Sequence, residues 1–138
     1  MDELLKAWHD RTSVPPVAQL LGAHLEEYGS GRASMTMEAT AAHHNAMGTL
    51  HGGLLGALAD MAIGAALATT LEDGEGFTTL TLNASYLRAV VEGPVTASAE
   101  VVRRGRRTAL VRCRVDSGDR HVAEFDSNCL ILRADAHD

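Results

Sequence analysis

The residues best suited to chemistry lie where a long apolar segment begins. Gly52 and Gly53 open this segment, and Asp60 is the only charged residue between Leu54 and Leu71. The first turn of a helix presents unpaired N–H groups at the positive end of the helix dipole, so it attracts an anion or a polarised carbonyl oxygen. Glycine lets a ligand approach that backbone closely, although tight helix packing explains the two glycines equally well.

The carboxylate within the apolar segment favours a functional interpretation. A lone carboxylate in an apolar helix is costly unless it is paired or functional. Asp60 is therefore either a structural hydrogen-bonding residue or a catalytic group. His51, just before the glycines, is by itself more typical of a residue that caps a helix or fixes a loop than of a catalyst.

The spacing of these residues predicts a shared site. Asp60 lies eight residues after Gly52, which is about 12 Å along a helix. Asp60 is therefore too far away to serve a carbonyl group docked at the start of its own helix. A two-fold partner with an antiparallel helix could bring its own Asp60 to that place. If both residues are catalytic, the protein is at least a dimer.

The elements that must position these residues follow from periodicity and turn signals. Before a loop at residues 40–50, the pattern predicts short helices at 2–10 and 17–21 and a strand at 23–38, broken near Gly29-Ser30-Gly31 by a hairpin turn or bulge. The apolar helix spans about 52–71. Four strands then follow in meander-like succession, at about 79–86, 95–101, 109–115 and 121–132.

These elements give an α+β fold class, with one long central helix wrapped by one antiparallel β-sheet. We expect one domain at 1–138, made of a helical segment at 1–22, a core at 23–132 and a frayed tail at 133–138. The first strand after the helix has a period of two. One face is predicted to carry Thr79, Thr81, Asn83 and Ser85, and the other Leu80, Leu82, Ala84 and Tyr86.

Composition narrows the classes of function. The net charge of −6 argues against a general nucleic-acid binder, which is usually basic. Cys113 and Cys129 both lie in predicted strands, and we expect reduced, buried thiols. The segment 54–71 approaches the length of a membrane span, but Asp60 at its middle would be expensive in lipid, so we expect a helix buried in protein and no membrane partner. The N-terminus lacks an apolar run of signal-peptide length, which makes a cytoplasmic protein the default expectation.

A motif around these residues resembles a known family. The pattern Asn-x-x-Gly-x-x-His-Gly-Gly-x(6)-Asp resembles that of the PaaI-like acyl-CoA thioesterases of the hotdog-fold superfamily. The resemblance spans about residues 14–132 and includes a Gly-Arg-Arg turn at 105–107 and the strand at 80–83. The motif positions are Asn45, Gly48, His51, Gly52, Gly53 and Asp60.

The resemblance implies a role for each motif residue. Asp60 matches the family's nucleophile or general base, contributed across a dimer, and the Gly52 N–H matches the donor that polarises the thioester carbonyl. His51 matches the residue that positions this turn, and Asn45 matches the side chain that orients substrate or water. A hydroxyl residue on the strand after the helix helps to hold the water, and Thr79, or its neighbour at 78, occupies that region. Hydrolysis of a thioester needs this combination of carbonyl polariser, base or nucleophile, and placed water.

Basic residues supply candidates for the coenzyme A phosphates, because guanidinium groups match phosphate oxygens well. Arg106 and Arg107, with Arg103 and Arg104, surround a turn at Gly105, and a solvated turn that balances nearby acids is the alternative. Arg88 is a similar candidate, and Gly53 is a substrate-binding candidate beside Gly52. The lack of aromatic interleaving argues against single-stranded nucleic acid.

Several alternatives compete with the thioesterase interpretation. His43, His44 and His51 with Asp60 invite a metal site, but adjacent loop histidines diverge and no His-x-x-x-His helix face is present, so no metal or other cofactor is expected. A hotdog-fold enoyl or 3-hydroxyacyl thioester (de)hydratase and a non-catalytic acyl-CoA-binding protein remain alternatives. The expected partners are an acyl-CoA, with an aryl- or phenylacetyl-type acyl group among the options, and further copies of the chain, as a dimer or a tetramer of two dimers. An acyl-carrier-protein thioester is the alternative to an acyl-CoA as substrate.

Overall fold

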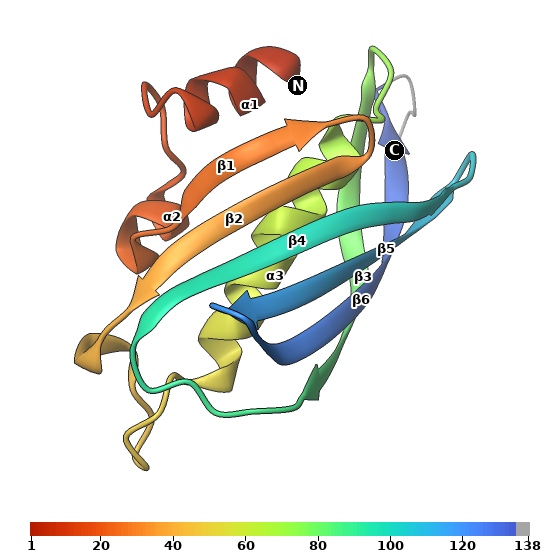
Figure 1. Ribbon diagram of the computed structural model, residues 1–138. Helices are drawn as coiled ribbons and strands as arrows, with labels where there is room; N and C mark the ends of the chain where they lie inside the picture. The colour runs from red at the N-terminus through yellow and green to blue at the C-terminus, as the bar shows by residue number, and fades with distance from the viewer. Residues whose placement is uncertain (135–138) are drawn as a thin grey trace.

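A computed structural model describes residues 1–134 of the chain (Figure 1). The predicted tail at 133–138 therefore lies largely outside the described residues. The helices and strands, in chain order, are α1 (Asp2–His9), α2 (Pro16–Leu21), β1 (His24–Gly29), β2 (Arg32–Ala39), a 3-10 turn (Ala41–His43), α3 (Gly52–Ala68), β3 (Glu75–Tyr86), β4 (Gly93–Arg104), β5 (Thr108–Ser117) and β6 (Arg120–Arg133).

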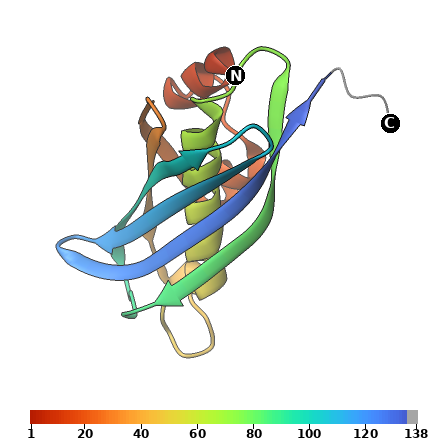
Figure 2. The same cartoon turned by 90° about the vertical axis from the view of Figure 1, so that its right-hand side faces the viewer.

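The described chain forms a six-stranded antiparallel sheet that curls around the single long helix α3 (Figures 1 and 2). The predicted fold class, a hotdog with one central helix wrapped by an antiparallel sheet, is confirmed. The prediction of four consecutive strands in a meander is wrong for β3. The strand order is β1-β2-β4-β5-β6-β3, so β3 pairs with β6 at the sheet edge and β4 pairs with β2. A period of two reports which face a residue occupies, and it does not report which strand lies next to it.

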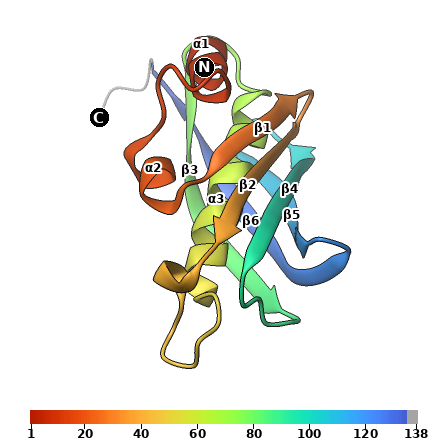
Figure 3. The same cartoon turned by 60° about the vertical axis from the view of Figure 1, so that its left-hand side comes forward.

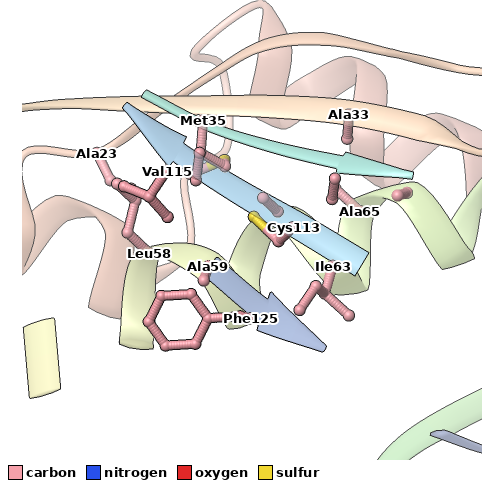
Figure 4. Packing of buried hydrophobic residues seen from close by; sticks show 14 of the residues in the cluster. Ala23, Ala33, Met35, Leu58, Ala59, Ile63, Ala65, Cys113, Val115 and Phe125 are labelled. Carbon is pink, nitrogen blue, oxygen red and sulfur yellow. The ribbon is translucent and has the colours of Figure 1, made fainter. Parts of the chain in front are cut away.

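The helix α3 packs mainly on β2, β4 and β5. Its side chains toward that side are apolar and fully buried, as Leu58 shows. Figure 4 shows Leu58, Ala59 and Ile63 between the helix and the sheet, with Ala59 drawn beside the ring of Phe125 of β6. The helix ends at Ala68 rather than at 71. The two threonines that follow turn their hydroxyls back to helix carbonyls, Thr69 to Ala66 at 2.7 Å and Thr70 to Leu67 at 2.7 Å, an arrangement that competes with further helical hydrogen bonds.

The break predicted near residues 29–31 is a tight hairpin. Ser30 and Gly31 both have positive φ, at 53° and 76°, between Gly29 and Arg32, which face each other across β1 and β2. Two central residues with positive φ match the right-handed twist of the flanking strands. Both cysteines are free and buried, as expected. Burial raises the pKa of the Cys113 thiol to about 12, so this thiol is not a nucleophile at neutral pH.

The predicted faces of β3 are corrected by a β-bulge. The pairing with β6 shifts between Thr79 and Thr81, which leaves Leu80 as the extra residue. An extra residue reverses the alternation beyond it. Thr79 therefore shares the helix-facing side with Leu82 and Tyr86, and not with Thr81 as the uninterrupted period predicts.

The N-terminal helices lie outside the sheet. Helix α1 crosses over the end of the molecule where α3 finishes, and α2 lies beside β1 (Figure 3). Leu5 of α1 is buried in the core and Trp8 packs against it. No helix of the described residues is long and apolar enough to cross a membrane.

Candidate active site

One stripe of α3 faces the edge strand β3. Its four members recur every fourth residue, a spacing that places them on one side of a helix. Three of the four lack a side chain, so helix and strand come close together. A Cβ at Gly56 would lie 4.0 Å from the Leu82 side chain, and a Cβ at Gly64 would lie 3.2 Å from the Phe77 ring. The members are Gly52, Gly56, Asp60 and Gly64.

Asp60 is the one polar member of this stripe, and the hydroxyl of Thr79 on β3 lies beside it. The Thr79 hydroxyl donates to Asp60 Oδ1 at 3.1 Å, and both residues are half-buried. Among the described residues, no hydrogen bond reaches Asp60 Oδ2 and no cation pairs with the carboxylate. Thr78, the neighbour that the sequence left open, is exposed and lies on the other face. The bulge at Leu80 lies directly after this contact.

The N–H groups in the first turn of α3 differ in whether they are already hydrogen-bonded. His51 caps the helix, and its Nδ1 accepts from the Gly53 N–H at 2.9 Å. The His51 carbonyl accepts from the N–H groups of Leu54 and Leu55. Within residues 1–134, no acceptor is bonded to the Gly52 N–H. The Gly52 N–H is therefore the group of this turn that is available to an oxygen from outside, whereas the Gly53 N–H, a predicted substrate contact, is already bonded.

The histidine cap also fixes the protonation pattern of the ring. Since Nδ1 of His51 accepts, the proton of the neutral ring lies on Nε2. The ring is exposed to solvent, and it acts on the turn through Gly53. The ring thus holds the turn through Nδ1, and the positioning role of His51 stays a prediction.

Tyr86 is a site residue that the sequence analysis did not select. Its hydroxyl donates to the Gly52 carbonyl at 2.7 Å. A Cβ at Gly52 would lie 3.1 Å from the Tyr86 ring, so a side chain at 52 would require the ring to shift. Arg88 shares a cavity of about 300 Å³ with Gly52 and Tyr86. The period of two already grouped Tyr86 with Leu82 on one face of the strand, but it carries no sign that this face meets Gly52.

Asn45 stabilises the loop that leads to α3. Its Oδ1 accepts from the backbone N–H groups of Met47 at 2.9 Å and Thr49 at 3.2 Å, and its Nδ2 donates to the Thr49 hydroxyl at 3.0 Å. His44 holds the same loop from the other side, through Nε2 and the Val91 carbonyl at 2.7 Å. The predicted contact of Asn45 with substrate or water would use the amide hydrogen that these bonds leave over.

The arginines of the β4–β5 turn divide into two groups. Arg104 and Arg133 both form ion pairs with Glu75, whose side chain is 4% exposed. The Glu72 backbone N–H, followed by the charges of Arg104 and Arg133, holds the pKa of Glu75 below its usual value. Arg104 therefore has a structural role, because its ion pair with Glu75 joins β4 to the start of β3. The remaining arginines of the turn are exposed and form no ion pair with the described residues; they are Arg103, Arg106 and Arg107.

The single chain brings the predicted residues together in two groups. Asp60 and Thr79 form one group at the middle of α3, and Gly52, His51 and Arg88 form the other at its start. Two helical turns separate them along the same stripe, as the spacing predicted. No group of three potential metal ligands occurs in the described chain.

Comparison with known proteins decides the family. A model of the thioesterase superfamily matches residues 47–124, which is more than half of the chain and includes both groups of site residues. This chain belongs to the thioesterase superfamily. The predicted resemblance to PaaI-like hotdog thioesterases and the predicted class of enzyme, a thioester hydrolase, are confirmed.

Individual relatives agree with this assignment. The chain is 30% identical over 97 residues to 1,4-dihydroxy-2-naphthoyl-CoA hydrolase of Listeria monocytogenes, covering 70% of this chain and 79% of the relative. It is 32% identical to the structure of a phenylacetic acid degradation-related protein from Ralstonia eutropha, with a TM-score of 0.81 over 89% of this chain and 98% of the other. A variant of the phenylacetic acid degradation protein PaaI from Thermus thermophilus is 33% identical, with a TM-score of 0.79 over 84% and 98%.

Proposed function

We propose that this protein is an acyl-CoA thioesterase whose active site is completed by two subunits. In each site, Asp60 of one subunit acts on a thioester whose carbonyl oxygen accepts from the Gly52 N–H of the partner subunit. The observation that carries the proposal is the half-buried Asp60, held at Oδ1 by Thr79 with Oδ2 unbonded, on a stripe that otherwise has no side chains. The family membership of the chain and the naphthoyl-CoA substrate in the name of its Listeria relative support a CoA thioester.

The edge strand supports a dimer. Strand β3 has an unpaired edge, and both of its faces are exposed from residue 80 onward. An open edge invites pairing with another strand, and several side chains of β3 are apolar, with Leu80 56% and Leu82 37% exposed. Antiparallel pairing of two β3 edges about a two-fold axis would set the two α3 helices antiparallel. The Asp60 of one subunit would then lie toward the Gly52 end of the other.

The chemistry follows from these groups. The partner's Gly52 N–H stabilises negative charge on the thioester oxygen as the carbonyl carbon is attacked. Either Asp60 removes a proton from a water that adds to the carbon, or Asp60 adds directly and water later hydrolyses the anhydride. In the first route the carbon–sulfur bond breaks and the CoA sulfur takes the proton that Asp60 removed from water. In the second route CoA leaves as the thiolate and takes a proton from solvent, and hydrolysis of the anhydride returns that proton. Thr79 keeps the carboxylate in place through Oδ1. A single turnover in isotopically labelled water separates the routes, because only direct attack leaves label in Asp60.

CoA recognition is assigned to exposed arginines. Arg88 lies in the cavity beside Gly52, and Arg106 and Arg107 lie in the β4–β5 turn near the other end of α3. In a dimer with antiparallel helices, that turn lies on the side of the partner's Gly52. Guanidinium groups there would bind the phosphates and leave the chemistry to Asp60.

The alternative functions lack a matching arrangement. A (de)hydratase needs a histidine and an acid acting together, but Nδ1 of His51 already accepts from the Gly53 N–H, which gives the ring a positioning role in the turn. A non-catalytic acyl-CoA-binding protein would not need an accessible carboxylate in an apolar stripe. Release of free thiol from a panel of acyl-CoAs tests the proposal directly, and the absence of thiol release from every member would contradict it.

Subunit mixing tests the shared site. Protomers carrying Asp60→Asn and protomers carrying Gly52→Val should each be nearly inactive alone. In a mixed dimer, one site receives both changes and the other receives neither. Random reassortment makes half of the dimers mixed, so a shared site predicts recovery of about a quarter of the wild-type activity. If each site lay within one chain, mixing would recover none.

A further inference from the structure

The free N–H of Gly52 belongs to a peptide unit whose carbonyl is already bonded. That carbonyl is the one of His51, and it accepts from the N–H groups of Leu54 at 2.9 Å and Leu55 at 3.4 Å. Hydrogen bonds accepted by a carbonyl polarise the N–H of the same peptide unit and strengthen it as a donor. The direction of this donor depends on the next peptide unit, which joins Gly52 to Gly53, because glycine allows the two planes to rotate freely.

Side chains hold that next peptide unit at both of its ends. The Gly53 N–H donates to Nδ1 of His51 at 2.9 Å, and the Gly52 carbonyl accepts from the Tyr86 hydroxyl at 2.7 Å. His51 is part of the helix cap and moves with it. Tyr86 reaches the peptide from another element, β3, so its hydroxyl fixes the start of α3 relative to the sheet.

The Tyr86 ring is itself held in place. It meets the ring of Phe125 of β6 edge-on, with centroids 5.8 Å apart and planes at 90°, which is a favourable arrangement for two aromatic rings. On the helix side, a Cβ at Gly52 would lie 3.1 Å from the ring, and a Cβ at Gly56 would lie 4.0 Å from the hydroxyl. The two glycines therefore let the ring lie directly on α3, within hydrogen-bonding distance of its first turn.

The chain after Tyr86 is anchored on both the sheet and the loop before α3. The two residues that follow Tyr86 donate their backbone N–H groups to the Val122 carbonyl of β6, at 2.9 and 3.2 Å. The Val90 carbonyl accepts from the Leu50 N–H at 2.7 Å. The segment 86–90 thus holds the chain on either side of the peptide that carries the free Gly52 N–H.

We propose that Tyr86 is a positioning residue for thioester hydrolysis, because its hydroxyl keeps the Gly52 N–H directed at the thioester oxygen. This inference rests on the proposed function. Tyr86 contacts no reacting atom in this scheme and acts through the backbone of Gly52. The direction of the donor matters most in the transition state, where the thioester oxygen gains negative charge. A loss of the Tyr86 hydroxyl should therefore lower kcat and leave KM almost unchanged.

The kinetic test uses Tyr86→Phe, which removes the hydroxyl and keeps the ring against Phe125. For the acyl-CoA of the panel with the highest kcat/KM, kcat should fall by about three- to tenfold, as expected for one hydrogen bond, and KM should stay within about twofold. Tyr28→Phe is the matched control, since Tyr28 is the other tyrosine of the chain and its ring lies against His9 of α1. A lower Tm of Tyr86→Phe with wild-type kcat would show that the hydroxyl only stabilises the fold.

An infrared measurement separates this inference from the proposed function. The same acyl-CoA, labelled with ¹³C at its carbonyl, is bound to the Asp60→Asn variant, which should leave it unhydrolysed. A hydrogen bond from the Gly52 N–H lowers the carbonyl stretching frequency, and this downshift should become smaller when Tyr86→Phe is added but not when Tyr28→Phe is added. An equal downshift with and without the Tyr86 hydroxyl would overturn the positioning role and leave the proposed function intact. If the bound thioester showed no downshift in Asp60→Asn alone, Gly52 would not be the donor, and both proposals would fail.

Discussion

The two sides of α3 are built differently. Toward β2, β4 and β5 the helix presents apolar side chains such as Leu58, which is fully buried. Toward β3 it presents three glycines and one carboxylate, against a strand that is exposed on both faces beyond Thr79. The first side is complete within one chain. The second side has open space, a polar pair and an unpaired edge, and these are the features that a substrate and a second subunit would use.

The largest effect is expected from a change at Asp60, on the side of α3 that faces β3. Asp60→Asn keeps the shape and the bond from Thr79 but removes the charge, so kcat should fall by two or more orders of magnitude, as is typical when a general base is lost. Thermal stability and oligomer size should stay close to wild type. Asp119→Asn, in the exposed β5–β6 turn, is the matched control and should retain activity. Near wild-type turnover by Asp60→Asn would mean that the carboxylate is structural.

A change on the side of α3 that packs on β2, β4 and β5 should lower stability and leave activity almost unchanged. Leu58→Ala leaves a cavity in a fully buried position and should lower the free energy of unfolding by about 2–5 kcal/mol. At a temperature where the variant is folded, kcat should change little, because Leu58 does not face β3. Chemical denaturation monitored by circular dichroism, with activity measured in parallel, checks both parts. A large loss of kcat in the folded variant would show that the two sides are coupled.

These two positions also show how far sequence alone could go. Asp60 stood out because a charge interrupts an apolar helix, and its spacing from Gly52 follows from helix geometry. Sequence alone could not decide whether Thr79 or Thr78 faces the helix, because the bulge at Leu80 arises from the pairing with β6. The position of β3 at the sheet edge and the contact of Tyr86 with Gly52 also depend on pairing between strands that are distant in the sequence. Periodicity does not report which strands pair.

A smaller effect is expected at the start of α3, where Tyr86 packs against Gly52. A Cβ at Gly52 would meet the Tyr86 ring at 3.1 Å, so Gly52→Ala should displace the tyrosine and disturb the free N–H. We expect kcat to fall by about tenfold, within the range for weakening one oxyanion donor. Gly76→Ala is the control, because a Cβ there meets nothing within 4 Å. Equal activity in both variants would remove Gly52 from the site.

The smallest effect is expected at the exposed β4–β5 turn. Replacing Arg106 and Arg107 with Ala should raise KM for an acyl-CoA several-fold through lost phosphate contacts, with a smaller effect on kcat. A pantetheine thioester lacks those phosphates and should respond much less. The change Arg32→Ala, at an exposed surface ion pair with Glu100, controls for general loss of positive charge. Equal losses on both substrates would place the turn outside CoA recognition.

The bulge at Leu80 has a consequence for the lengths that this chain can tolerate. A single-residue deletion in β3 next to the bulge would restore a regular alternation. Thr79, Leu82 and Tyr86 would all stay on the side that faces α3, because the strand would then have no residue without a partner in β6. The strand between Phe77 and Tyr86 should therefore tolerate the loss of Leu80, whereas insertions would shift its pairing with β6 and move Tyr86 away from Gly52. The turn at residues 72–74, which precedes the strand, should accept them, since a change of length there leaves the two contacts with α3 in phase.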